Sequence, residues 1–320
     1  MAVSKSFTVL RKLWMQFRNL SRGALRRLRL LDFVKWIKYK GYELLIGIDY
    51  RGQSASDKIY ESLVSKEPVM ICRLGNTEAS KLKEMSLVLD NKVEYDNNRF
   101  EIIRVYSGFF PITFENMKKF HVRMFKDIKL IDILGCWSPE ELFFKKYLTK
   151  AKKIPLVDLE PWYHSNPWSR ALGGKKVLVI HPFESTIKSQ YKKRDKLFAD
   201  QNVLPKFTLK TLKAVQSLGG DSDEFSDWFD ALKSMEKKIS SIDFDIAIIG
   251  CGAYGLPLAA HVKRMGKKAV HMGGATQLLF GIKGKRWEDS NFKFINEHWV
   301  RPLEEEKPKN HKQVENSCYW

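Results

Sequence analysis

Three glycines in Gly250-Cys251-Gly252-Ala253-Tyr254-Gly255 have the spacing G-x-G-x-x-G directly after the apolar run 245–249. This spacing lets backbone N–H groups approach a phosphate at the amino end of the next helix. A dinucleotide cofactor also needs an acidic residue at the end of the following strand to hold a ribose, and residues 269–274 contain none. Gly250, Gly252 and Gly255 therefore indicate a nucleotide or sugar phosphate rather than NAD or FAD, with a tight packing turn as the alternative.

A second turn carries oxygen-bearing side chains: Asn76 and Glu78 follow Arg73 and Gly75 at the end of the apolar segment 69–74. A carboxylate beside an amide can hold a hard divalent ion against a diphosphate. On this interpretation Arg73 and Gly75 contact the same phosphate-bearing ligand. The alternative is an ordinary helix start, with Asn76 as the cap and Glu78 favoured by the helix dipole.

Further polar residues follow two other apolar segments. His181 and Glu184 come after 177–180 and are candidates for a catalytic base or for contact with an acceptor. A buried core histidine is the alternative for His181. Gly274 and Gln277 come after 269–272 and are further candidates for ligand binding.

The elements that carry these residues alternate short β-branched runs with amphipathic stretches, which is typical of βαβ units. The expected strands are 69–74, 130–134, 154–159, 177–180, 245–249 and 269–272. The expected helices are 56–66, 77–87, 113–126, 139–149, 184–199, 223–240, 256–265 and 275–282. The pattern predicts a doubly wound, mostly parallel, Rossmann-like α/β sheet. Because ligands bind at the carboxyl edge of such sheets, the six segments that follow these strands are expected to converge on one site.

Composition limits the class of protein. The chain has 320 residues, of which 44% are hydrophobic and 29% charged, so it can form a sizeable core. Its four cysteines show neither a disulfide framework nor zinc-ligand spacing. No apolar run is long enough for a membrane span or has the form of a secretory signal, so we expect a cytoplasmic location.

The amino-terminal segment 1–42 is unusually basic, with eleven Lys or Arg against the single acid Asp32, although the whole chain carries a net charge of +19. Apolar residues there recur every three or four positions, among them Trp14, Phe17 and Leu28. A basic amphipathic helix on an anionic membrane surface fits this pattern. A helix packed on its own domain, a transit peptide and an RNA contact are the alternatives. We expect three parts: this segment, an α/β domain over 43–300, and a polar, loosely held tail over 301–320.

The turn Arg73-Leu74-Gly75-Asn76-Thr77-Glu78, together with the glycine-rich strand-turn-helix from Gly250 to His271, resembles the GT-D-fold bacterial glycosyltransferases of polysaccharide-biosynthesis loci. The resemblance covers about residues 55–290. It implies a Rossmann-like domain, a nucleotide-sugar donor and a divalent metal, Mn or Mg, held with the diphosphate at Asn76 and Glu78. Asn76 replaces the usual Asp of the pattern, which removes one charge and should weaken the metal site.

The resemblance also implies a cell-surface glycan or a lipid-linked acceptor at the cytoplasmic membrane face, which suits the basic segment 1–42. No nucleic-acid partner is expected. Two other functions stay open: a non-catalytic scaffold that binds a nucleotide or a glycan, and an S-adenosylmethionine-dependent methyltransferase. The methyltransferase would require an acid after the strand that follows the glycine turn, and none is present there.

Overall fold

The computed structural model describes residues 40–217, 224–314 and 316–320. The chain forms two compact units, 1–45 and 46–320, and the second contains the whole sheet. Most of the expected amino-terminal amphipathic helix lies outside the described residues. Within the described ranges, no helix combines the length and the hydropathy that a bilayer-spanning helix requires.

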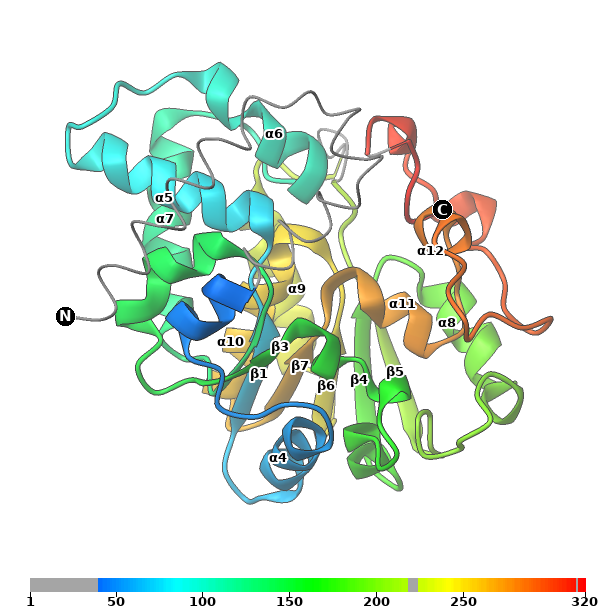
Figure 1. The fold of residues 1–320 in the computed structure, drawn as a ribbon. Coiled ribbons are helices and arrows are strands. Elements are labelled where there is room, and N and C mark those ends of the chain that lie inside the picture. The colour runs from blue at the N-terminus through cyan, green and yellow to red at the C-terminus, as the bar shows by residue number, and fades with distance from the viewer. Residues whose placement is uncertain (1–39, 218–223, 315) are drawn as a thin grey trace, which may run out of the picture. The chain divides into compact units, whose positions relative to one another are not determined.

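The larger unit is built on one seven-stranded sheet of order β3-β2-β1-β7-β6-β4-β5, and all of its neighbouring strands are parallel (Figure 1). This confirms the predicted α/β fold. The strands are β1 (Val69–Arg73), β2 (Ile133–Cys136), β3 (Lys152–Pro155), β4 (Lys176–His181), β5 (Thr208–Lys213), β6 (Ile246–Ile249) and β7 (Lys268–His271).

The helices are α4 (Gln53–Val64), α5 (Asn76–Leu89), α6 (Asn97–Ser107), α7 (Phe114–Ile128), α8 (Glu184–Tyr191), α9 (Trp228–Ser240), α10 (Gly255–Arg264), α11 (Thr276–Leu279) and α12 (Lys285–Asp289). The predicted helix 139–149 is instead the 3-10 segment η1 (Pro139–Tyr147), and the predicted helix 184–199 ends at Tyr191. Strand 154–159 is shorter than predicted, because the chain turns at Pro155 into the 3-10 segment η2 (Leu156–Leu159).

Both faces of the sheet are covered. The side chains of Val69, Val179 and Ile248 share one core with Ile59 of α4 and Ile187 of α8. Helix α10 packs on β1, β6 and β7 and contributes nothing to that core, so it covers the opposite face. The sheet is therefore doubly wound, with its carboxyl edge open between the two layers.

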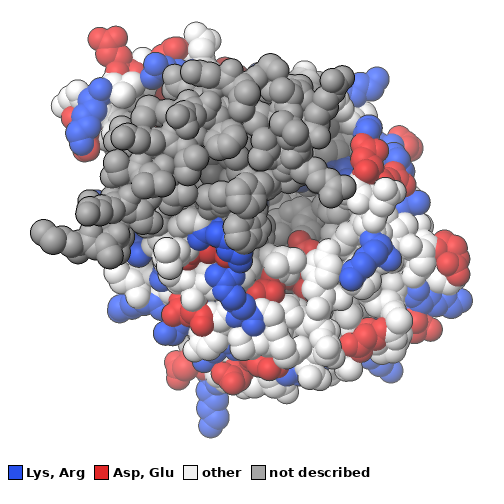
Figure 2. Space-filling view, viewed as in Figure 1, with Lys and Arg blue, Asp and Glu red and all other residues white. Residues whose placement is uncertain are grey.

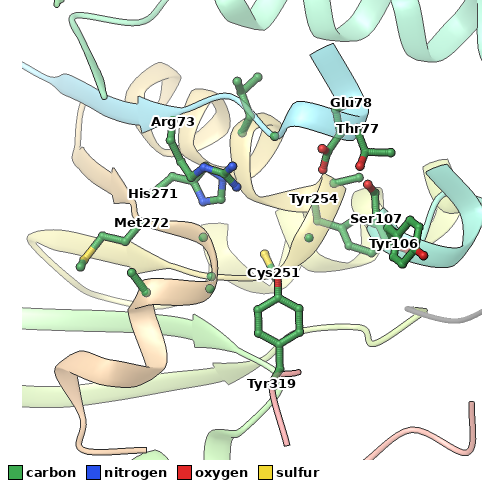
Figure 3. A pocket seen from close by; sticks show the side chains of 18 of the residues that line it. Arg73, Thr77, Glu78, Tyr106, Ser107, Cys251, Tyr254, His271, Met272 and Tyr319 are labelled. Atoms are coloured by element: carbon green, nitrogen blue, oxygen red, sulfur yellow. The ribbon is translucent and has the colours of Figure 1, made fainter. Parts of the chain in front are cut away.

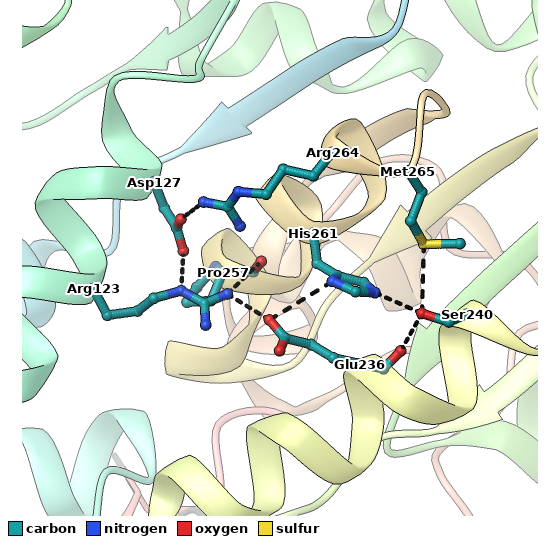
Figure 4. Close-up of polar contacts among 8 residues, drawn as sticks. All are labelled: Arg123, Asp127, Glu236, Ser240, Pro257, His261, Arg264 and Met265. Atoms are coloured by element: carbon teal, nitrogen blue, oxygen red, sulfur yellow. Dashed lines mark hydrogen bonds and ion pairs between the residues drawn. The ribbon is translucent and has the colours of Figure 1, made fainter.

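An ion-pair network fixes α10 to α7 and α9 (Figure 4). Arg123 donates to Asp127 at 2.6 Å and to Glu236 at 2.5 Å, and Arg264 also pairs with Asp127. Asp127 is fully buried, so both arginines are needed to balance its charge. His261 lies beside Glu236 and hydrogen-bonds Ser240 at the other end of the network. These contacts hold in place the helix that begins at the glycine turn.

The carboxyl-terminal residues differ from the expected loose tail. Val314, Cys318 and Trp320 are buried in the same core as β1 and β4. Glu306 is only 4% exposed and accepts hydrogen bonds from the backbone of Ser185 and Thr186. The packing of this segment could not be predicted from the polar composition of 301–316, because a few buried side chains are enough to attach a segment to a core.

Candidate active site

A cavity of about 410 Å³ opens at the carboxyl edge of the sheet, and the residues that line it follow all seven strands. The lining includes Arg73–Ala79 after β1, Trp137 after β2, Leu159 and Glu160 after β3, His181–Phe183 after β4, Val215–Ser217 after β5, Gly250–Tyr254 after β6 and Met272–Ala275 after β7. The six segments that were expected to converge are thus brought together, and a seventh joins them after β5. A cavity of this size suits a ligand as large as a nucleotide.

Arg73, at the end of β1, lines this cavity (Figure 3). Its guanidinium lies over the indole of Trp137 at 4.8 Å, and that indole donates to the carbonyl of Leu74 at 2.9 Å. A Cβ at Gly273 would lie 3.0 Å from the Arg73 Cδ, so the bare backbone leaves room for the arginine. The Arg73 Nε is buried without a hydrogen-bond partner. No acidic side chain among the described residues pairs with it, so Arg73 is available to an anion.

The turn after β1 places Glu78 on the cavity wall (Figure 3). The Glu78 carboxylate lies against Gly75. A Cβ at Gly75 would lie 1.8 Å from the Glu78 Oε2, so a side chain there would displace the flexible Glu78 carboxylate. Asn76 begins α5, but its side chain does not cap the helix. Its Oδ1 instead accepts a hydrogen bond from the Ser138 hydroxyl at 2.5 Å.

These residues fit the implied metal poorly. The turn offers one carboxylate and one amide oxygen that is already hydrogen-bonded, whereas Mg²⁺ and Mn²⁺ are held mainly by charged oxygen ligands. The described part of the chain contains no group of three or more His, Cys, Asp or Glu that could hold a metal ion.

The glycine turn after β6 lines the cavity with Gly250 and Gly252. Gly252 has φ +55°, which side-chain-bearing residues rarely adopt. Gly255 lies outside the lining, and a Cβ there would be 2.1 Å from the His271 ring. The spacing G-x-G-x-x-G thus combines two positions on the cavity wall with one that packs α10 against β7.

Gly274 and Gln277 both line the cavity but are tied to the carboxyl-terminal segment. A Cβ at Gly274 would lie 2.6 Å from the Tyr319 ring, and the Gln277 Nε2 donates to the Tyr319 carbonyl at 3.1 Å. Tyr319 itself forms part of the cavity wall (Figure 3). These two residues therefore shape the site by holding Tyr319.

Two buried histidines reach the cavity, and both are neutral. His181 accepts a hydrogen bond from the Phe183 N–H through Nδ1, so its proton is on Nε2. The Nδ1 of His271 lies 3.2 Å from the Ile249 carbonyl and must donate to it. Burial lowers the pKa of His181 to about 3. Burial, reinforced by the charge of Arg73, lowers the pKa of His271 to about 3 as well. A base this weak is poorly matched to proton transfer near neutral pH.

Glu184 does not line the cavity. Its Oε1 accepts from the Thr211 hydroxyl at 2.6 Å and pairs with Lys188 at 2.9 Å, which places it on the β5 side of α8. The expected catalytic pair therefore separates: His181 reaches the site and Glu184 does not.

Several cavity residues were not candidates from the sequence, among them Gln216 and Trp320, and Glu160 lies in one of the six expected segments but was given no role. The Gln216 Nε2 and the Trp320 Nε1 are buried without hydrogen-bond partners, as is the Arg73 Nε. The lining thus presents several unsatisfied donors, which suits a ligand rich in acceptor oxygens. Gln216 follows β5, which was not predicted, and Trp320 belongs to the segment expected to be loose. Glu160 follows an expected strand, but its sequence gave no sign of unusual burial.

The backbone resembles two solved structures. One is described by the words "The highly conserved domain of unknown function 1792 has a distinct glycosyltransferase fold"; the alignment covers 85% of this chain and 97% of that one, with a TM-score of 0.43 and 11% identity. The other is a selenomethionine-substituted structure of domain of unknown function 1792; the alignment covers 84% and 96%, with a TM-score of 0.41 and 10% identity. No known protein family and no curated protein sequence matches the chain.

Proposed function

We propose that this protein is a glycosyltransferase that takes a sugar from a nucleotide-sugar donor, with Arg73 bound to the donor diphosphate. The observation that carries the proposal is Arg73 at the carboxyl edge of the sheet, whose Nε is buried without a hydrogen-bond partner. A buried donor without a partner costs free energy unless a ligand supplies an acceptor, and a diphosphate offers several oxygens to an arginine. Gly252 leaves exposed backbone beside the same cavity, whereas Gly250 is buried against Gly273 and Thr276.

The same observation disfavours S-adenosylmethionine. An arginine binds phosphate oxygens especially well, and S-adenosylmethionine has no phosphate. A non-catalytic scaffold would use the cavity for binding alone, so measuring turnover as well as binding separates it from the enzyme.

For the acceptor, we propose a cell-surface glycan or a lipid-linked sugar, reached by a cytoplasmic protein attached peripherally to the inner face of the membrane. The basic, amphipathic sequence of residues 1–42 supports this location. No nucleic-acid partner is proposed, because so much of the positive charge is concentrated in that segment.

The test is nucleotide binding by Arg73→Ala. UDP, GDP and dTDP should be screened against the full chain by thermal shift. The nucleotide that stabilises the wild type should bind the variant at least 10-fold more weakly, because charged hydrogen bonds contribute roughly 1.5–3 kcal/mol each. Arg170→Ala is the matched control, since Arg170 also lies over an aromatic ring, that of Tyr60 at 3.9 Å, but is paired with Asp57.

The control should bind nucleotide like the wild type. Equal affinity in Arg73→Ala would reject the role of Arg73, and absence of any nucleotide effect on the wild type would reject the donor. Release of nucleoside diphosphate from UDP-, GDP- and dTDP-sugars then tests for an enzyme, since a scaffold would bind without turnover.

A further inference from the structure

Among the described residues that line the cavity, only Glu78 and Glu160 have carboxylate side chains. They come from different elements, the start of α5 and the end of η2. Glu78 is folded back over Gly75 at the start of its own helix. Glu160 follows β3, which is separated from β1 by β2 in the sheet. No lysine or arginine contributes to the shift of its pKa.

The chain around Glu160 is fixed by short-range hydrogen bonds and by aromatic packing. The Glu160 N–H donates to the Val157 carbonyl at 3.1 Å, and the Tyr163 N–H donates to the Glu160 carbonyl at 3.3 Å. Trp162, two residues further on, is stacked on Phe198 with ring centroids 6.1 Å apart. The backbone that carries Glu160 is therefore fixed where the residue lines the cavity.

The surroundings of the Glu160 carboxyl change its proton affinity. Burial raises its pKa to about 7, and the neighbouring Trp162 indole offsets only part of that effect. A carboxyl in this range exchanges protons readily near neutral pH, whereas the two cavity histidines are too weakly basic to do so. Of the titratable groups described around the cavity, Glu160 is the one best matched to accepting a proton.

We propose that Glu160 is the catalytic base that removes the proton from the attacking hydroxyl during sugar transfer; this rests on the proposed function. The acceptor oxygen forms a bond to the anomeric carbon while its proton passes to the Glu160 carboxylate. The bond from the anomeric carbon to the donor phosphate oxygen breaks, and its electron pair leaves with the nucleoside diphosphate. Arg73 stabilises the charge that develops on that leaving group.

The experiment compares full-length wild type with Glu160→Gln, using the UDP-, GDP- or dTDP-sugar that the wild type hydrolyses. Water is then the acceptor, and release of the nucleoside diphosphate is measured from pH 5 to 9. The wild-type rate should rise tenfold per pH unit below about 7 and then level off. In Glu160→Gln the rate should fall about 100-fold or more and lose this dependence, while nucleotide affinity stays within about threefold of the wild type.

Transfer to azide distinguishes a catalytic role of Glu160 from a structural one, because loss of a structural residue would slow transfer to azide as well as to water. It attacks as an anion and has no proton to remove, so glycosyl azide should form at similar rates in both proteins. Glu140→Gln is the matched control, because Glu140 follows another strand end but pairs with Lys83 at the surface, at 3.1 Å. It should retain wild-type turnover and the wild-type pH profile.

Three results would overturn the assignment: unchanged hydrolysis in Glu160→Gln, a retained pH dependence, or loss of azide transfer together with hydrolysis. If the wild type itself binds no nucleotide, the proposed function fails and the role of Glu160 falls with it. If both proteins bind nucleotide and any of the three results is found, Glu160 is not the base, but the proposed donor site is retained.

Discussion

At the scale of residues, burial in the same cavity has different effects on Arg73 and Glu160. The Nε of Arg73 is buried without a hydrogen-bond partner, so a ligand with acceptor oxygens would satisfy it. The Glu160 carboxyl can become neutral, so the cost of burial appears as a pKa raised to about 7. Neither property is visible in the residue types. Both depend on which neighbours the fold supplies.

Asn76 gives the residue-scale prediction on metal use. Asn76→Asp adds a second carboxylate beside Glu78, so the apparent affinity for Mn²⁺ should rise by roughly tenfold or more if the metal takes part. Nucleoside diphosphate release should be titrated with MnCl₂ in the wild type and the variant. Asn116→Asp is a control, because Asn116 lies on α7 outside the cavity. Equal activity of both proteins in EDTA and in Mn²⁺ would favour metal-free transfer.

At the scale of elements, the sequence predicted the strands that are buried on both faces. Ile246–Ile249 is a continuous apolar run, and it forms the fully buried β6. Strand β5 was missed because Thr208–Lys213 reads Thr-Leu-Lys-Thr-Leu-Lys, which shows no apolar run and suits an exposed edge. Because site residues were sought after predicted strands, missing β5 also meant missing Gln216, which follows it.

Helix starts show a second limit of sequence-based prediction. A helix was expected over 223–240, and α9 begins at Trp228. It is capped by Asp227, which accepts from the Asp230 N–H at 2.8 Å. Helix α8 has no local side-chain cap at all. Its first N–H groups are satisfied by Glu306, about 120 residues later in the chain, and no local pattern can reveal such a partner.

Glu306 therefore gives the element-scale prediction. Its carboxylate accepts from the Ser185 N–H at 2.7 Å, from the Thr186 N–H at 3.3 Å and from the Thr186 hydroxyl. Glu306→Ala should lower the free energy of unfolding by roughly 1–3 kcal/mol, because it leaves buried donors without an acceptor. Urea denaturation followed by circular dichroism measures the change. Exposed Glu305 is the matched control, and equal midpoints for Glu306→Ala and Glu305→Ala would refute the capping role.

At the scale of the whole molecule, charge is distributed unevenly along the chain. On the face shown in Figure 2, the described residues carry acidic and basic side chains intermixed. The sequence 1–42, by contrast, has eleven basic residues and one acid. Intermixed charges largely cancel beyond about 8–10 Å at physiological salt, so a strong attraction to an anionic surface is expected from the amino-terminal segment rather than from this face.

The whole-molecule prediction follows from that asymmetry. Deleting residues 1–42 should release the protein from phosphatidylserine-containing vesicles in a sedimentation assay, since each basic residue near such a surface contributes about 1 kcal/mol. Nucleotide binding should persist, because every residue that lines the cavity lies at Arg73 or beyond. Full-length protein should detach progressively as salt increases, and any binding that survives in high salt would measure the apolar contribution of residues such as Trp14 and Phe17.

Charge and hydrophobicity can be separated by a second pair of variants. Replacing Arg26, Arg27 and Arg29 with Gln should weaken vesicle binding at low salt, whereas Trp14→Ala should weaken the part that resists salt. If the truncated chain fails to fold, the apolar stripe of 1–42 belongs to the core instead. If the full-length chain ignores vesicles and binds RNA with a steep salt dependence, the basic segment serves a nucleic acid, and the proposed membrane-linked acceptor loses its main support.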